Sequence, residues 1–452
     1  MPGTSHSKII ALFRRADLAF LFGIAFGLAA SSAGCRNSAA TSEKTKLLLA
    51  THWTDYQRAA INRYLAEYLQ LHPELEIEHQ NVPFEDYFKK VQISHLSGEA
   101  PDIYNVYSLW GVQLVNSGVL DPPPAEVVND VTQNYIAAAI KGVTINGEIW
   151  GIPGELDNYC LVYNKKILKE IGAVDEHGAA RPPATWEELI DIAKRATTFD
   201  SEGNILRYGY AFLVGWDSAV VHPFLALLYS NGGRFLTADG KQCAFNGPQG
   251  VAALQAELRL FHEKGTDTRG SVWEFPNQRV AMMIMATWYE SELELLLGRA
   301  YEETVGTAPI PRLGSAPATL LYTWFLCVDS RSRHKKEAWD LLMWLTAELQ
   351  AGKQTTRLGD FFCTTLKALP GRKIDIANHQ DELNDLYTSA FVKELENSIT
   401  EPNLDQGQEI KMILMNAIVD AWHGKRGAPE ALNYAAKKID YILREFVTRG
   451  ND

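Results

Sequence analysis

The sequence predicts an α/β protein with two lobes, each a β-sheet flanked by helices. The chain has 452 residues, and single hydrophobic cores stop growing at roughly 250 to 300 residues. Hydrophobic residues make up 46% of the chain and charged residues 22%, as in ordinary soluble globular proteins. Strand patterns also alternate with helical patterns between residues 46 and 106, an order that implies parallel strands with helices on both faces.

The first elements can be placed from hydrophobic periodicity. An apolar run of strand type is followed by Ile61 and Leu65 at helical spacing, and Pro73 closes that helix. The predicted order is strand 46–50, a helix through Leu65, strand 76–82, a helix through Tyr87 and Val91, and strand 102–106.

The next segment is punctuated by Gly and Pro. A β-rich stretch over 147–153 and a buried strand over 159–163 are predicted, with an interruption between them. A helix then begins after Thr185, which with Glu188 has the spacing of a capping box. Further helices are predicted over 248–264, 335–348, 408–424 and 429–449.

Residues 1–34 have the pattern of a secretory signal peptide. Basic residues precede an apolar run over 18–30, which ends in small residues and Cys35. The segment Ser32-Ala33-Gly34-Cys35 resembles a bacterial lipobox, although the usual Leu is replaced by Ser32. We therefore predict lipidation at Cys35 and a tether over 35–45; an ordinary signal peptide followed by an incidental Cys is the alternative.

Charge and missing motifs limit the function. The 43 Lys and Arg against 55 Asp and Glu give a net charge of −12, which argues against nucleic acid as a partner and favours a neutral or cationic ligand. No G-x-x-x-x-G-K-[ST], G-x-G-x-x-G, G-x-S-x-G, H-E-x-x-H or C-x-x-C motif occurs. We therefore predict no catalytic residue, no metal and no cofactor. Cys160, Cys243, Cys327 and Cys363 could pair or remain free thiols.

Five blocks of the sequence stand out by their order and spacing. They are Gly98 to Ile103, Gly147 to Pro153 with Val162 to Lys165, Pro183 to Leu189, Asn231 to Phe235 with Phe245 to Pro248, and Val280 to Ile284 with Trp288. Together they resemble the extracellular solute-binding proteins of the sugar-binding family that serves ABC importers, the group of maltose-binding protein. The resemblance runs from about Lys46 to the C-terminus.

The resemblance implies a type II periplasmic-binding-protein fold, in which two lobes are joined by several hinge crossings and close over a ligand. We place the crossings near 155–158, 312–320 and 358–363. Lobe 1 is then 46–155 plus 320–358, and lobe 2 is 159–312 plus 363–452. The implied protein is an anchored extracytoplasmic monomer, in the periplasm or on the outer face of the cytoplasmic membrane. Its expected partners are a carbohydrate, a permease and the ATPase subunits, and its only membrane contact is the lipid.

Candidate ligand-binding residues follow from sugar chemistry. Aromatic rings stack on the C–H faces of a sugar, and carboxylates and amides bond its hydroxyls. Trp53 and Trp288 follow strands, and Glu155 and Asp157 lie where relatives place a hydroxyl-binding carboxylate, although one of the two could be only a hinge-surface charge. The full set is Trp53, Asp55, Tyr107, Trp110, Glu155, Asp157, Trp216, Asp217, Trp288, Trp324, Asn403, Asp405 and Gln406.

Other interpretations stay open at this stage. Trp186, Trp339, Trp344 and Trp422 lie in helical patterns and are assigned to packing. Two converging carboxylates would suit a glycan-acting enzyme. A sensor that presents its closed state to a membrane signalling receptor would use the same fold and site.

Overall fold

The computed structural model describes residues 44–263, 266–267 and 272–449. The described residues belong to one compact unit that begins at Lys44. The predicted signal peptide, the lipidated Cys35 and nearly all of the tether lie outside the described residues.

The first strands form a parallel sheet with helices between them, as predicted. Strand β1 pairs in parallel with β2, with Leu47 opposite Ile77, and with β3, with Leu49 opposite Ile103. Thr54 precedes the first helix, and its backbone N–H donates to the side chain of Gln57 at 2.9 Å, which satisfies one donor at that helix end. These elements are β1 (Thr45–Thr51), α1 (Asp55–Leu71), β2 (Leu75–Asn81), α2 (Phe84–Ser97) and β3 (Ile103–Tyr107).

Two long, buried strands, β6 (Ile152–Asn164) and β13 (Thr319–Val328), continue the sheet. They pair antiparallel, with Tyr322 opposite Asp157, and β13 also pairs antiparallel with β3. The predicted interruption over 154–158 is therefore wrong. Pro153 stands near the strand start, where proline is tolerated, and a Cβ at Gly154 would lie 3.0 Å from the carbonyl oxygen of Trp324, so glycine allows the close approach of β13.

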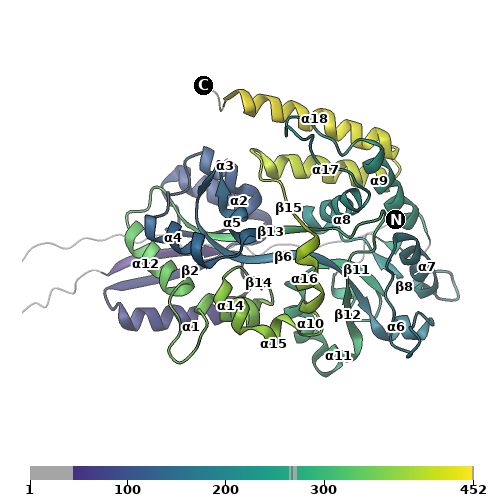
Figure 1. Ribbon diagram of the computed structural model, residues 1–452, viewed down its shortest axis with the longest axis horizontal. Helices are drawn as coiled ribbons and strands as arrows, with labels where there is room; N and C mark the ends of the chain where they lie inside the picture. Colours follow the sequence, from purple (N-terminus) through teal and green to yellow (C-terminus); the bar gives the residue numbers. More distant parts are fainter. Residues whose placement is uncertain (1–43, 264–265, 268–271, 450–452) are drawn as a thin grey trace, which may run out of the picture. The chain divides into compact units, whose positions relative to one another are not determined.

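Four more strands extend this sheet. Three separate two-stranded sheets are formed by β4 (Thr144–Ile145) with β5 (Glu148–Ile149), β7 (Thr198–Phe199) with β8 (Ile205–Arg207), and β9 (Tyr210–Ala211) with β10 (Thr266–Asp267). Strands β11 (Met282–Ala286) and β12 (Val305–Ala308) pair antiparallel with the second half of β6. Short strand β14 (Leu369–Pro370) pairs with the first half of β6, and β15 (Ser398–Thr400) pairs in parallel with β13. The order through the described sheet is β11-β6-β13-β3-β1-β2, so β6 and β13 connect its two ends (Figure 1).

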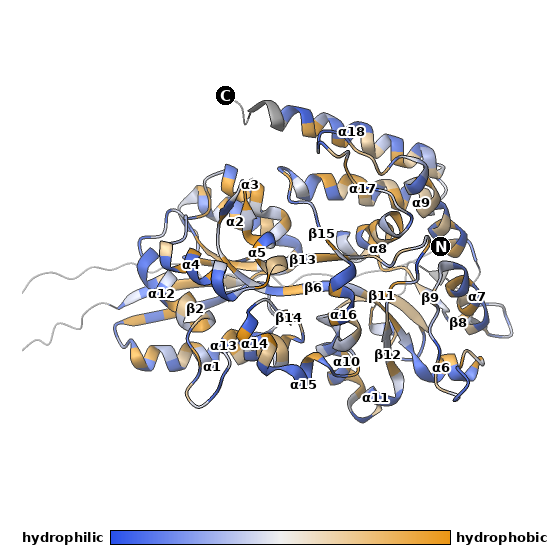
Figure 2. Ribbon diagram, viewed as in Figure 1, coloured by the Kyte–Doolittle hydropathy of each residue, from blue (hydrophilic) through white to orange (hydrophobic). Residues whose placement is uncertain are grey.

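Helices pack around the sheet, and the predicted long ones are confirmed with small shifts at their ends. Hydrophobic residues run along the central strands, whereas helices such as α1 and α18 show both hydrophobic and hydrophilic residues (Figure 2). Besides α1 and α2, the longer helices are α7 (Trp186–Ala196), α8 (Asp217–Ser230), α9 (Pro248–Phe261), α12 (Lys335–Thr346), α17 (Gly407–Trp422) and α18 (Ala428–Arg449). The others are α3 (Gly111–Asn116), α4 (Ala125–Asn134), α5 (Ala137–Val143), α6 (Lys165–Glu170), α10 (Tyr289–Leu297), α11 (Tyr301–Thr304), α13 (Arg357–Asp360), α14 (Lys373–Asn378), α15 (Gln380–Leu383) and α16 (Thr388–Glu394).

The start of α7 shows how local sequence sets a helix end. The Thr185 hydroxyl accepts the backbone N–H of Glu188 at 3.3 Å, as predicted for an N-cap. The Glu188 carboxylate, however, accepts the N–H of Ala184 at 2.8 Å, one residue before the cap. The four tryptophans assigned to packing, Trp186, Trp339, Trp344 and Trp422, are all buried.

The segment after α12 packs against α1 and α4. Arg372 forms an ion pair with Asp130 at 2.7 Å, and the Asp375 carboxylate accepts two hydrogen bonds from Thr356. Helix α16 packs instead against β6 and β12. The predicted crossing near 358–363 falls in α13 and in the π-helix Phe361–Leu366 that follows it.

Candidate ligand-binding site

A cavity of about 270 Å³ opens at the middle of β6 and β13. Segments far apart in the sequence contribute to it: the ends of β1 and β3, the starts of α1, α2 and α8, and the loop after β11. Its lining residues are His52, Thr54, Gln57, Phe84, Glu85, Tyr107, Glu155, Asp157, Tyr159, Trp216, Ser218, Trp288, Glu292, Tyr322, Trp324 and Leu366.

Aromatic rings form much of the wall. Trp216 precedes α8 and Trp288 precedes α10; their ring centroids are 6.0 Å apart and the planes are tilted by 55°. Trp324 on β13 stacks on His52 with centroids 3.7 Å apart and an interplanar angle of 18°. Burial lowers the pKa of His52 to about 3, so this imidazole is neutral at physiological pH. The wall therefore offers flat apolar faces without a positive charge.

Two carboxyls on β6 line the cavity between these rings. Glu155 and Asp157 are separated by one residue, so their side chains share a face of the strand, and they are 1% and 2% exposed. Neither is a surface charge. The Thr287 hydroxyl donates to Asp157 at 2.6 Å, whereas Oε2 of Glu155 has no hydrogen-bond partner in the described part of the chain.

Burial changes how these two acids titrate. Burial raises the pKa of Glu155 to about 8, and the negative charge of Asp157 adds to the effect. Burial also raises the pKa of Asp157, but hydrogen bonds from Thr287 and the backbone of Trp288 favour the ionised form, so its pKa is about 6. Of the two acids, Asp157 therefore ionises the more readily.

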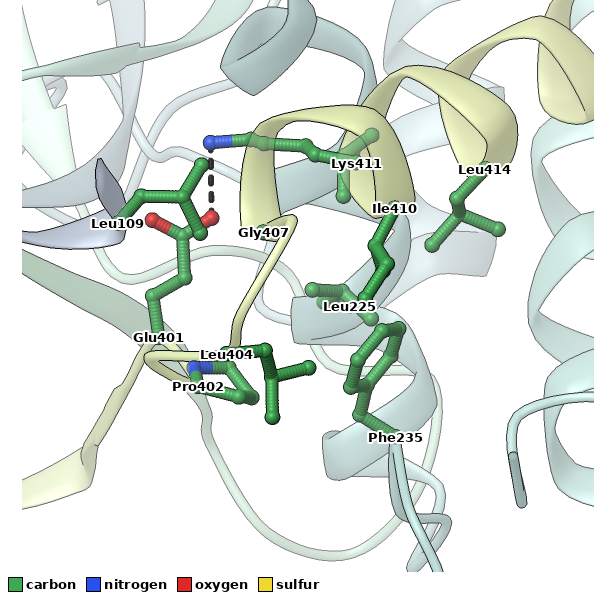
Figure 3. Close-up of a pocket in the computed structure, with 11 residues that line it drawn as sticks. Leu109, Leu225, Phe235, Glu401, Pro402, Leu404, Gly407, Ile410, Lys411 and Leu414 are labelled. Atoms are coloured by element: carbon green, nitrogen blue, oxygen red, sulfur yellow. Dashed lines mark ion pairs between the residues drawn. The ribbon is translucent and has the colours of Figure 1, made fainter. Parts of the chain in front are cut away.

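A third buried carboxyl group, Glu401, lies beside the cavity and forms an ion pair with Lys411 on α17 at 2.8 Å (Figure 3). The His222 imidazole on α8 also approaches this carboxylate to 2.8 Å. The hydroxyl of Tyr107 donates a hydrogen bond to the same carboxylate. Burial alone would raise the pKa of Glu401, but Lys411 and His222 hold it well below its ordinary value. We refer to Glu401, Lys411, His222 and the Tyr107 hydroxyl as the ion cluster.

The ion cluster touches the cavity through shared residues. Lys411 donates to the hydroxyls of Tyr107 at 2.9 Å and Ser218 at 2.6 Å, and both of these residues line the cavity. The void beside the ion pair is only about 20 Å³ and is walled mainly by apolar side chains such as Leu225 and Leu414. This space admits about one water molecule, so the larger cavity is the candidate for a solute.

The structure brings six of the predicted ligand-binding residues to the cavity. The buried carboxyls arrive from the alternation of β6, and the aromatic residues arrive from strand ends and helix starts. The six are Tyr107, Glu155, Asp157, Trp216, Trp288 and Trp324.

The other predicted residues do not line the cavity. Trp53 is buried and packs on Phe361 with centroids 4.8 Å apart, and Asp55 is an exposed first residue of α1 paired with Arg58. The Trp110 indole donates to Gln408, whose amide in turn donates to Asp217 at 2.6 Å.

The loop before α17 also lies away from the cavity wall. Asp405 accepts a hydrogen bond from Asn116 at 2.8 Å, and Gln406 has a positive φ of 54° and precedes α17. Asn403 has a buried carbonyl oxygen without a partner among the described residues. None of these three residues lines the cavity.

Sequence reasoning missed several lining residues. Tyr159 continues the alternation of Glu155 and Asp157 along β6, a signal hidden by the predicted interruption. Phe84 and Glu85 begin the helix after a parallel strand, where ligand sites of α/β folds gather. Thr54, Gln57, Ser218 and Leu366 gave no comparable signal, since their position depends on packing between distant segments.

The cysteines, possible metal ligands and helix lengths of the described residues bear on three further predictions. Cys160, Cys243, Cys327 and Cys363 are free thiols. Within the described ranges, no group of three or more His, Cys, Asp and Glu side chains is arranged to hold a metal ion. None of the helices there combines the length and apolar character needed to cross a membrane.

Residues 53–351 match the family model described as bacterial extracellular solute-binding protein. This chain belongs to that family. Among its relatives, a binding protein of Brucella abortus is 24% identical over 82% of this chain and 87% of its own length. The maltodextrin-binding protein of Bacillus subtilis is 22% identical, covering 77% and 79% of the two chains.

Solved structures place this solute-binding protein in the two-lobe type II periplasmic-binding-protein fold. An ABC transporter solute-binding protein of Thermotoga lettingae, bound with α-D-tagatose, matches with a TM-score of 0.75 and 22% identity. The match covers 89% of this chain and all of that one. The predicted fold class is confirmed.

Proposed function

We propose that this solute-binding protein is the extracytoplasmic substrate-binding component of an ABC importer and captures a sugar or oligosaccharide in the cavity. The observation that carries the proposal is the combination of Trp216, Trp288 and Trp324 with two buried carboxyls in one space of about 270 Å³. Aromatic faces suit the apolar faces of a sugar ring, and the polar groups between them suit its hydroxyls. The maltodextrin-binding and tagatose-bound relatives support the same ligand class.

The capture mechanism we propose is closure of the two lobes. We assign β6, which contains the crossing predicted at 155–158, and β13, which begins within the one predicted at 312–320, as two of the crossings, because each pairs at its two ends with different strands. In place of the crossing predicted near 358–363, we assign as the third the segment from β15 to Glu401, which runs beside β13. A solute that contacts both lobes binds the closed state better, and it shifts the population toward that state by its differential affinity. The closed form would then dock on the permease.

Export and anchoring belong to the same proposal. The signal-peptide pattern before Cys35 and the family match support a location outside the cytoplasmic membrane, with the lipid on Cys35 as the membrane contact. A monomer suffices for this mechanism, since one chain supplies the whole cavity wall. Treatment with a lipoprotein signal peptidase inhibitor would lengthen the cellular protein if Cys35 is lipidated and leave its size unchanged if it is not.

Tryptophan fluorescence and thermal unfolding test the sugar proposal. A bound sugar should change the emission of Trp216 and Trp288, and at 100 times Kd it should stabilise the protein by about 2.7 kcal/mol. Trp216→Ala should weaken binding about tenfold or more, which requires about 1.4 kcal/mol. Trp150→Phe is the matched control, because Trp150 is only partly buried and lies outside the cavity.

The same samples separate the competing functions. If no mono- or oligosaccharide changes either the emission or the unfolding temperature, the sugar proposal fails. If chromatography finds a carbohydrate product after incubation, the protein is an enzyme rather than a binding component.

A further inference from the structure

The charge of the cavity wall is one-sided. Among the described residues that line it, Glu85, Glu155, Asp157 and Glu292 carry carboxyls, and none is Lys or Arg. His52 is the single basic side chain in that set, and burial keeps it neutral by lowering its pKa to about 3. A solute in this cavity therefore meets acids and no fixed positive charge.

Within the part of the chain that the structure describes, neither of the two inner acids, Glu155 and Asp157, has a Lys or Arg partner. Asp157 faces Thr287 and the backbone of Trp288 after β11, and Glu155 faces Trp53 after β1 and Asn105 on β3. From β13, Tyr322 lies opposite Asp157. These are neutral donors. The indole N–H of Trp53, the amide of Asn105 and Oε2 of Glu155 have no hydrogen-bond partner within the described ranges.

Two other buried acids, Glu401 and Glu257, have different surroundings. Glu401 forms an ion pair with Lys411 at 2.8 Å. Glu257 lies alone on α9, accepts a hydrogen bond from the Trp422 indole at 3.3 Å, and has its pKa raised by burial to about 8. A single protonated acid is neutral and needs no counter-ion. Asp157 is different, because it lies beside a second carboxyl and the Thr287 hydroxyl donates to it at 2.6 Å, which favours its charged form. An uncompensated buried charge is costly.

Aromatic faces around the pair would also attract a cation. Tyr159 and Tyr322 line the cavity beside the two acids, with ring centroids 6.1 Å apart. A cation within about 6 Å of a ring centroid is attracted to the ring face, and the attraction grows when water is excluded. The same space thus combines ionisable carboxyls and electron-rich rings.

We propose, building on the sugar-binding function above, that the natural solute is an ammonium-bearing sugar whose positive charge lies against Glu155 and Asp157. The tilted pair Trp216 and Trp288 supplies apolar surface for the sugar ring. A neutral sugar can also accept hydrogen bonds there, but it leaves the Asp157 charge without a counter-ion. A linear polyamine offers the ammonium groups without a ring for the tryptophans.

Calorimetric titration of the purified full chain with paired probes tests this assignment. Each probe pair consists of an amino sugar and its N-acetylated form, in gluco, galacto and manno configuration and from one to three residues long. Within at least one pair the amine should bind at least about tenfold more tightly, a difference of about 1.4 kcal/mol. At pH 7 binding should release protons, measured in buffers of different ionisation enthalpy, because an ammonium group lowers the pKa of Glu155.

Variants assign the preference to the two acids. Asp157→Asn and Glu155→Gln should bring the affinity ratio of amine to N-acetylated form toward one. Glu257→Gln is the matched control, since it removes a buried acid of similar pKa that lies outside the cavity, and it should leave the ratio unchanged. Thermal unfolding of each variant shows that it is folded before titration.

The outcomes are distinguishable. If neutral or N-acetylated sugars bind as well as or better than the amines throughout the panel, the ammonium assignment is overturned and the sugar-binding function stands. If spermidine binds while no sugar does, both the ring and the sugar-binding function are overturned. If no probe or neutral oligosaccharide binds at all, both proposals fail.

Discussion

The ion cluster around Glu401 and the cavity acids Glu155 and Asp157 differ in whether the chain itself provides a positively charged partner. In the ion cluster, Lys411 and His222 surround Glu401, and the pKa of Glu401 falls. In the cavity, Glu155 and Asp157 have no basic partner among the described residues, and their pKa values rise to about 8 and about 6. Tyr107 belongs to both sets, since its ring lines the cavity and its hydroxyl contacts Glu401.

The difference indicates that neighbouring buried acids can have separate roles, one in stabilising the fold and the other in binding a solute. A buried carboxylate paired inside its own chain is a fixed part of the fold, and removal of its partner is costly. A buried acid that faces an open cavity without a partner lowers the stability of the empty protein. A bound solute that pairs with it can recover that free energy.

The largest effect should come from Lys411→Met. This change leaves Glu401 buried without its main cation and should lower the free energy of unfolding at pH 7 by about 3–5 kcal/mol, as measured by urea denaturation. Lys166→Met removes a cation from an exposed pair with Glu303 at 3.2 Å and should cost about 0–1 kcal/mol.

The pH dependence of that loss checks its cause. Burial, followed by the charge of Lys411, lowers the pKa of His222. Without Lys411, His222 can take up a proton beside Glu401, so the loss should be smaller at pH 6 than at pH 8. Equal losses for Lys411→Met and Lys166→Met would show that the ion cluster does not stabilise the fold.

The next largest effect concerns Glu155 and has the opposite sign. Folding raises its pKa from 4.5 to about 8, so its contribution to stability is full below pH 4.5 and is lost as the pH rises through 8. Each unit of pKa shift corresponds to about 1.4 kcal/mol. Glu155→Gln should therefore unfold at a higher urea concentration than the wild type at pH 8 by more than it does at pH 5, in the absence of solute.

Glu257→Gln tests whether the fall of the free energy of unfolding with pH depends on the cavity. Burial also raises the pKa of Glu257 to about 8. In the absence of solute, Glu257→Gln should therefore reduce the fall in the free energy of unfolding between pH 4.5 and 8, as Glu155→Gln does. A wild-type protein whose stability rises steadily over that interval would contradict the assignment of both groups.

Much of the fold follows from local sequence pattern. The order from β1 to β3 appears in the hydrophobic periodicity, because each strand or helix there has one buried face with its own repeat. The predicted break over 154–158 failed because Gly154 and Pro153 resemble loop punctuation, whereas pairing with β13 on one edge and β14 on the other keeps the strand extended. Long-range pairing overrides local propensity at such positions.

The candidate site is predictable only in part for the same reason. Trp288 and the acids of β6 could be found because strand ends and alternation are local signals. The ion cluster could not, since Tyr107 and Lys411 are separated by 304 positions and a single Lys in an amphipathic helix has the pattern of a surface residue. Trp53 follows a strand as Trp288 does, yet Trp53 packs into the core. A tryptophan at the end of a strand therefore does not by itself predict a residue that lines the cavity.

The smallest effect should come from Tyr107→Phe, which separates the two regions at their shared residue. The ring that lines the cavity remains, whereas the hydroxyl that donates to Glu401 and accepts from Lys411 is lost. Because the charges stay balanced, the free energy of unfolding should fall by only about 1.5–3 kcal/mol, and the affinity for a bound sugar should stay within about twofold, or 0.4 kcal/mol. Tyr87→Phe removes two hydrogen bonds to neutral groups, one to the Ala50 carbonyl at 2.6 Å and one from the backbone N–H of Asn105 at 3.3 Å, and should cost about 0.5–1.5 kcal/mol for each. The double variant Tyr107→Phe with Lys411→Met should lose less free energy of unfolding than the two single variants lose together, since both changes remove contacts of one carboxylate. If the two losses add strictly, Tyr107 and Lys411 do not act on the same carboxylate.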